Sequence, residues 1–153
     1  MKNFLPWIAL AGVAVSLAAC NNGAAAPGPP APCGSPPGVS QTVLVYPAPG
    51  ATGVPDSIGQ VIVASNAAIS NSGPNTWDIE LEDGLGNGFL GNAFAPAPSP
   101  LPTPNQQPTF ANPVFQTSTF TNVNIPGETL AVVLNNTASS CTPSVQVGTF
   151  TTQ

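Results

Sequence analysis

The chain has 153 residues, a formal net charge of −5 and charged residues at only 5% of its positions. Lys2 is its single lysine or arginine and it has no histidine, so the chain beyond Lys2 carries carboxylates but no cationic side chain. This composition excludes nucleic-acid binding and electrostatic adhesion to anionic lipids, because both depend on Lys and Arg. It also excludes histidine triads, Schiff-base lysines and imidazole metal sites.

The N-terminus has the features of a secretory signal. Lys2 provides a positive charge, residues 4–17 form an apolar run, and small residues follow before two asparagines. The run is too short for a membrane-spanning helix, which needs about 20 apolar residues. The pattern predicts a signal peptide over residues 1–19. From the pattern alone, plain secretion with an incidental cysteine is the alternative.

The segment ends in Leu17-Ala18-Ala19-Cys20, which resembles the lipid-attachment box of bacterial lipoproteins. The resemblance implies that Cys20 becomes the first mature residue and carries the lipid, palmitate included, on its sulfur and amino group. Asn21 stands where that family has Asp for retention in the inner membrane, which implies transport to the outer membrane. We therefore expect a cell-envelope protein held to the membrane through a lipid anchor at Cys20.

Two further cysteines remain once Cys20 takes the lipid. Cys33 and Cys141 would then lie in an oxidising compartment, where disulfides persist. We predict a Cys33–Cys141 bridge, with two free thiols as the alternative. Residues 20–38 are rich in Pro, Gly and Ala and contain nothing apolar enough to bury. This composition predicts a tether, extended at about 3.1 Å per residue where proline dominates.

From residue 39 onward, short apolar runs alternate with turn residues. The run Gln60–Ser65 is apolar on both faces, which predicts a central strand. In Trp77–Glu82 apolar and acidic residues alternate, so the acidic ones are expected to face water. No segment after the signal has convincing helical periodicity, which favours an all-β sandwich. The predicted strands are Thr42–Tyr46, Gln60–Ser65, Trp77–Glu82, Phe89–Phe94, Thr117–Val123, Glu128–Leu134 and Ser144–Thr151.

Three stretches of this region are similar to bacterial immunoglobulin-like modules: residues 46–55 with the Val61-Ile62-Val63 strand, residues 124–130, and residues 148–152. The resemblance implies an immunoglobulin-like β-sandwich of about seven strands over residues 39–153. It also implies that Cys33 and Cys141 lie at the same end of the sandwich. Leu130 stands where many relatives have a tyrosine, and the antibody-type cysteine pair between the sheets is missing.

The proline-dense insertion over residues 95–113 is too long for an ordinary hairpin loop. We predict a stiff, solvated connection. The alternative is an exposed ligand for an aromatic groove on a partner.

Four acidic residues lie close together in the sequence: Asp78, Glu80, Glu82 and Asp83. We expect a solvated acidic strand face. A calcium site is the first alternative, but Asp83–Gly88 matches an EF-hand loop only in part, with Leu85 at its third position and Phe94 at its twelfth. A glycoside-cleaving pair of Glu80 and Glu82 is the second, because neighbours on one strand face are about 6.6 Å apart. We predict no cofactor and no catalytic residue.

Aromatic residues separate two functional hypotheses. Trp77 shares its strand face with Ile79 and Leu81, so we expect a core residue and not a sugar-stacking platform. The sequence thus predicts a non-enzymatic, lipid-anchored envelope protein presenting a structural or protein-interaction module. The alternative is a surface carbohydrate-binding module that stacks sugars on exposed aromatics. The expected partner is accordingly an envelope protein or a glycan.

Overall fold

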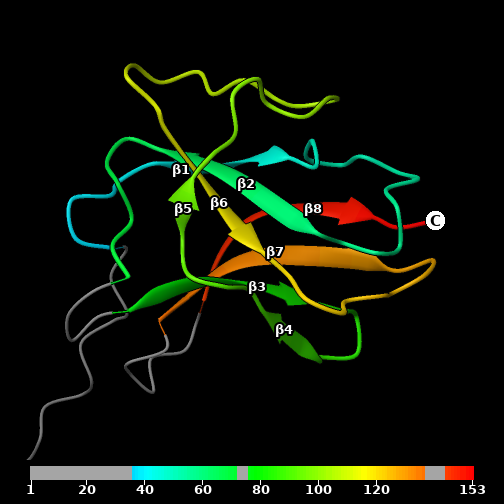
Figure 1. The fold of residues 1–153 in the computed structure, drawn as a ribbon. Helices are drawn as coiled ribbons and strands as arrows, with labels where there is room; N and C mark the ends of the chain where they lie inside the picture. The colour runs from blue at the N-terminus through cyan, green and yellow to red at the C-terminus, as the bar shows by residue number, and fades with distance from the viewer. Residues whose placement is uncertain (1–35, 72–75, 137–143) are drawn as a thin grey trace, which may run out of the picture. The chain divides into compact units, whose positions relative to one another are not determined.

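A computed structural model describes residues 36–71, 76–136 and 144–153. Within these ranges the chain forms two antiparallel sheets of four strands each and no helix, so no described helix is long and apolar enough to cross a membrane (Figure 1). The strands are β1 (Thr42–Tyr46), β2 (Gln60–Ser65), β3 (Trp77–Glu82), β4 (Gly88–Leu90), β5 (Ala95–Pro96), β6 (Val114–Thr119), β7 (Thr129–Asn136) and β8 (Val145–Thr151). The predicted signal peptide, and most of the predicted tether, lie outside the described residues.

The strand order confirms the predicted all-β sandwich. One sheet has the order β1-β2-β6-β5 and the other β4-β3-β7-β8. Lettered along the chain, the orders read ABED and CFG with one strand added beside C, the same strand orders as in immunoglobulin domains. The short strand β5 lies in the proline-dense insertion, where the sequence gives no strand signal.

The predicted bounds of β1, β2 and β3 are confirmed, and β2 is central as expected, between β1 and β6. The predicted strand Thr117–Val123 is wrong in its bounds. The observed strand β6 begins three residues earlier and ends at Thr119, and it pairs with β2 from Ser65↔Val114 to Gln60↔Thr119. Asn122, three residues beyond Thr119, takes a left-handed backbone conformation with φ of 60°.

The main core lies between the two sheets. It contains Leu44, Val61 and Val63 from one sheet, and β3, β7 and β8 supply its other half. Trp77 is 3% exposed and belongs to this core, which confirms the expectation. Leu130 is fully buried there, so at that position the chain fills the core with an aliphatic side chain in place of a tyrosine.

A second apolar cluster lies on the outer face of the first sheet. Ile62 and Ala64 of β2 are fully buried there, and Leu101 and Phe110 of the proline-dense insertion pack against them. The prediction of a solvated connection therefore holds for residues 98–100, which are exposed, and is wrong for Leu101 and Phe110. The physical reason is that β2 is apolar on both faces, so its outer face needs a cover.

Candidate functional site

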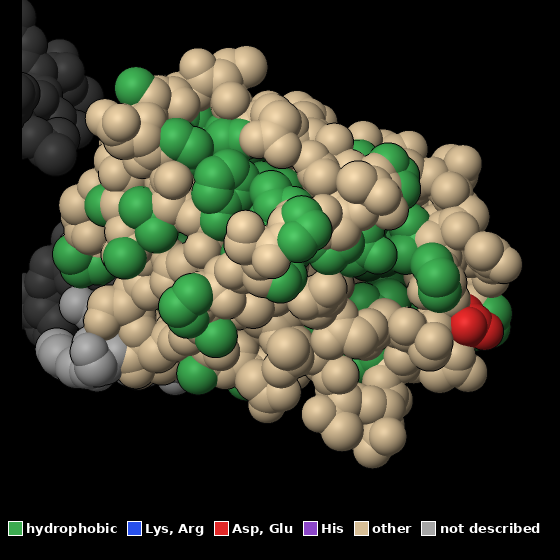
Figure 2. Space-filling view, turned by 45° about the horizontal axis from the view of Figure 1, so that its top comes forward, with side chains coloured by type: hydrophobic (Ala, Val, Ile, Leu, Met, Phe, Trp, Pro, Cys, Tyr) green, Lys and Arg blue, Asp and Glu red, His purple; other side chains and the backbone are tan. Residues whose placement is uncertain are grey.

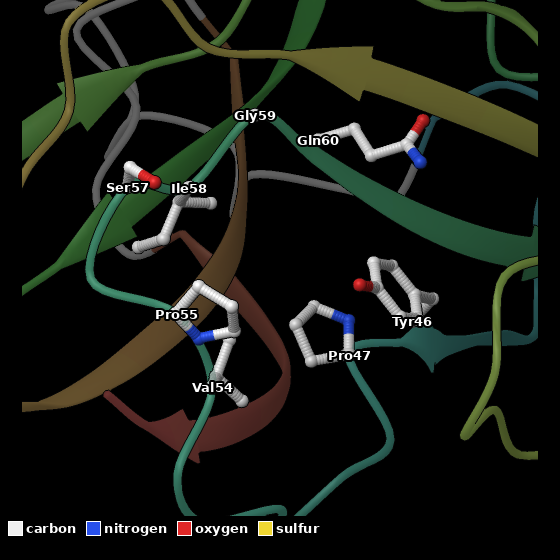
Figure 3. A pocket seen from close by; sticks show the side chains of 8 residues that line it. All are labelled: Tyr46, Pro47, Val54, Pro55, Ser57, Ile58, Gly59 and Gln60. Atoms are coloured by element: carbon white, nitrogen blue, oxygen red, sulfur yellow. The ribbon is translucent and has the colours of Figure 1, made fainter. Parts of the chain in front are cut away.

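The candidate site is a hollow of about 210 Å³ where β1 ends and β2 begins (Figure 3). Figure 3 shows the rings of Pro47 and Pro55 next to each other at its border, with the hydroxyl of Tyr46 turned towards the other lining residues. The remaining lining residues are Val54, Ser57, Ile58, Gly59 and Gln60. The hollow thus combines one aromatic ring with proline rings, a hydroxyl and a side-chain amide.

A β-bulge sets the direction of the Tyr46 side chain. The pairing of β1 with β2 shifts between Leu44 and Tyr46, which leaves Val45 as the extra residue. Side chains of a strand alternate between its faces, so without the bulge Tyr46 would share the inner face with Leu44. With it, Tyr46 packs instead against the outer cluster that contains Val45. The rest of the tyrosine side chain borders the hollow.

Two further hollows adjoin the first. One of about 260 Å³ shares Tyr46 and Pro47 with it and continues to Thr103 and Pro104. The other, of about 550 Å³, shares Ser57, Ile58 and Gly59 and continues to residues 122–124. We call the three together the Tyr46 groove. No charged side chain lines any of them.

The backbone around the Tyr46 groove is held by hydrogen bonds from distant segments. Gly50 N–H donates to Thr149 O at 2.7 Å, and Val54 N–H donates to Thr151 O at 3.1 Å. On the other side, Ile58 N–H donates to Val123 O at 3.2 Å. The loop between β1 and β2 is therefore fixed to β8 and to the segment after β6, which preorganises the groove.

The acidic strand face differs from its prediction at one position. Asp78 is only 8% exposed, so the expectation that it faces water is wrong. It sits on an interior strand, opposite Asn135 of β7, away from the short edge strand β4. Glu80 and Glu82 are half-buried; Glu80 Oε2 accepts a hydrogen bond from Asn135 Nδ2 at 2.5 Å.

Asp83 builds the turn between β3 and β4. Its Oδ1 accepts hydrogen bonds from the backbone N–H of Leu85 at 2.9 Å and of Asn87 at 2.8 Å. Its Oδ2 accepts one from Asn87 Nδ2 at 2.7 Å. These bonds, led by the Asn87 side chain, lower the pKa of the Asp83 carboxyl below its ordinary value of 3.8. Leu85 projects from this turn and is 85% exposed.

The four acidic residues do not form a ligand set in the described part of the chain. No three of its carboxylates or cysteines are grouped to hold a metal ion. Both oxygens of Asp83 are turned into their own loop. Glu80 Oε2 accepts a hydrogen bond from Asn135 Nδ2. The arrangement supports a structural role for these side chains.

The predicted lipidation and disulfide residues, Cys20, Cys33 and Cys141, lie outside the described residues. Their described neighbours are informative for the bridge. Pro36 and Val39, where the described chain begins, line the same hollow as Leu134 of β7 and Val145 of β8. The start of the sandwich and the ends of β7 and β8 that flank Cys141 therefore meet. The bridge itself stays a prediction.

The Tyr46 groove was not predicted from the sequence. The alternative of sugar stacking on exposed aromatics did not single out Tyr46, because the bulge that sets the direction of its side chain is a property of strand pairing. The dipeptide Tyr46-Pro47 at a strand end, followed by the turn-rich residues 48–55, was the available signal for an irregular edge.

On the face drawn in Figure 2, hydrophobic and neutral polar side chains are intermixed and acidic ones appear only at one edge.

Comparison with known proteins gives no further assignment: no protein-family model, curated protein or solved structure matches the chain.

Proposed function

We propose that the chain is a non-enzymatic, lipid-anchored protein of the cell envelope that presents an immunoglobulin-like sandwich as an interaction module. The observation that carries the proposal is the Leu17-Ala18-Ala19-Cys20 box at the end of an apolar N-terminal run. In this proposal Cys20 bears the lipid at the outer membrane, and residues 21–35 separate it from the first described residue of the sandwich.

The charge distribution supports a covalent anchor. Beyond Lys2 the chain has no cationic side chain. An anionic surface is repelled by anionic headgroups, so electrostatic binding would not hold this domain at a membrane. A single acyl chain binds only marginally, whereas two or more give stable attachment. Lipidation on both sulfur and amino group meets that requirement.

The acidic residues support a non-catalytic module. The carboxylate of Asp83 accepts hydrogen bonds within the β3–β4 turn, and the carboxylate of Glu80 accepts one from Asn135 of β7. A glycosidase requires one carboxylic acid and one carboxylate to flank a sugar bond. The proposal assigns both side chains to the stability of the sheet and its turn.

Fractionation of cells that express Cys20→Ala tests the proposal. We expect the unaltered protein to stay with membranes in high salt and to be released by detergent, because salt screens charge but not lipid insertion. Cys20→Ala is expected in the soluble envelope fraction. The matched control, Cys33→Ala, is expected to stay with membranes. Membrane retention of Cys20→Ala would contradict the anchor.

A further inference from the structure

We propose that the Tyr46 groove is a binding site for an uncharged glycan chain. This site goes beyond the anchored module, and its existence does not depend on the lipid at Cys20.

The charge distribution of the groove and of the domain favours an uncharged ligand. None of the three hollows is lined by a charged side chain. The described residues hold carboxylates and no Lys or Arg, so a phosphate-bearing or carboxylate-bearing ligand meets repulsion without a compensating cation.

The lining matches the two kinds of surface on a sugar. The faces of a pyranose ring are apolar C–H groups, which pack on an aromatic ring, and its edges are hydroxyls. Tyr46 offers the ring, and its hydroxyl is turned into the hollow (Figure 3). The amide of Gln60 and the hydroxyl of Ser57 provide neutral donors and acceptors beside it.

The shape favours a chain over a single small molecule. The three hollows share lining residues in sequence, from Thr103 and Pro104 through Tyr46 and Ser57 to Asn124. The hollows adjoin through these shared residues, and Asp56, which lies between Pro55 and Ser57 in the chain and is half-buried, lines none of them. Because the walls are fixed to β8 and to the segment after β6, a ligand would not need to order them.

Affinity electrophoresis of the whole chain in detergent tests the proposal. The protein is negatively charged and migrates in native gels, so binding to a neutral polymer in the gel appears as retardation. The probes are a soluble β-linked glucan, an α-linked glucan and a mannan. We expect retardation by at least one probe and about a tenfold weaker interaction for Tyr46→Ala.

Companion variants separate binding from folding. Tyr46→Phe keeps the ring and its packing on the outer cluster but removes the hydroxyl that is turned into the hollow, so it should bind more weakly than the unaltered chain and more strongly than Tyr46→Ala. Gln60→Ala removes a polar contact at the groove and should weaken binding in a folded protein. Leu85→Ala, on the exposed β3–β4 turn, should bind as the unaltered chain does.

Three results would overturn the inference. The first is the absence of retardation by all three polymers. The second is equal retardation of Tyr46→Ala and the unaltered chain. The third is that a neutral proline-rich peptide, and no glycan, perturbs the amide resonances of the lining residues, since aromatic grooves also bind such peptides. Membrane fractionation is unaffected by any of these, so failure of this site is distinguishable from failure of the anchor.

Discussion

The side chain of Asp83 accepts three hydrogen bonds from its own turn, two at Oδ1 and one at Oδ2. The folded state therefore favours the ionised carboxyl, and its pKa is lowered from 3.8. A group whose pKa is lowered by folding contributes stability above its unfolded pKa and loses that contribution as pH falls through the folded pKa. The order of this turn should therefore weaken only below about pH 4.

The first prediction concerns the pKa of Asp83. In Asn87→Ala the side-chain donor to Oδ2, the largest cause of the shift, is removed. We expect the carboxyl of Asp83 to titrate closer to 3.8 in this variant than in the unaltered chain, as followed by NMR of the side-chain carboxyl carbon. Gln146→Ala, an exposed position on β8, serves as control. Identical midpoints in Asn87→Ala and the unaltered chain would contradict the assignment.

This turn shows what the sequence predicts at the residue scale and what it does not. Asp83–Gly88 is rich in glycine and contains Asp and Asn, a composition typical of turns, and in the structure it joins β3 to β4. Its partial likeness to a calcium loop arises because Asx turns and calcium loops use similar residues. The direction of the two carboxylate oxygens distinguishes an Asx turn from a calcium loop, and this direction cannot be read from the amino-acid composition.

At the scale of elements, the proline-dense insertion covers a sheet face. Phe110 and Leu101 lie over Ile62 and Ala64, and Gln106 N–H donates to Val45 O at 3.0 Å. The insertion therefore contributes to the free energy of unfolding of the sandwich.

The second prediction tests that contribution. Phe110→Ala is expected to lower the free energy of unfolding by about 1.5–3 kcal/mol, less than for a fully buried phenylalanine because Phe110 is half-buried. Thr109→Ala, exposed in the same segment, should change it by less than about 0.5 kcal/mol. Chemical denaturation measures both. Equal stability of the two variants would show that the insertion does not pack on the sheet.

Strand prediction succeeded where local residues set the boundary and failed where pairing sets it. Pro47 ends β1, and the turn residues before Gln60 start β2, so both were predictable. The bounds of β6 follow from its register with β2, which the sequence does not display. The apolar residues on both faces of β2 predicted a central strand, but they did not identify the segment that covers its outer face.

At the scale of the whole molecule, different hollows lie at the two ends of β1. The described chain begins at Pro36, beside a hollow that includes Thr42 at the start of β1. The Tyr46 groove lies where β1 ends. The first described residues and the Tyr46 groove therefore lie at opposite ends of this strand.

The predicted Cys33–Cys141 bridge belongs to the same scale. It would close a loop of roughly a hundred residues and contribute roughly 4–5 kcal/mol in the chain-entropy model. The shared hollow of Pro36, Leu134 and Val145 brings the flanking segments together. We expect Cys33→Ser and Cys141→Ser to destabilise the domain equally, and the double variant no further. Denaturation of the three variants measures this; unequal single variants would contradict a bridge.

The most direct test of the anchored-module account is the intact mass of the protein purified from envelope membranes. We predict a chain that begins at Cys20 and carries covalent lipid, with a gain of about two mass units on reduction of the bridge. A mass without lipid, or a chain that begins elsewhere, would contradict the account. The protein would then be a freely secreted β-sandwich.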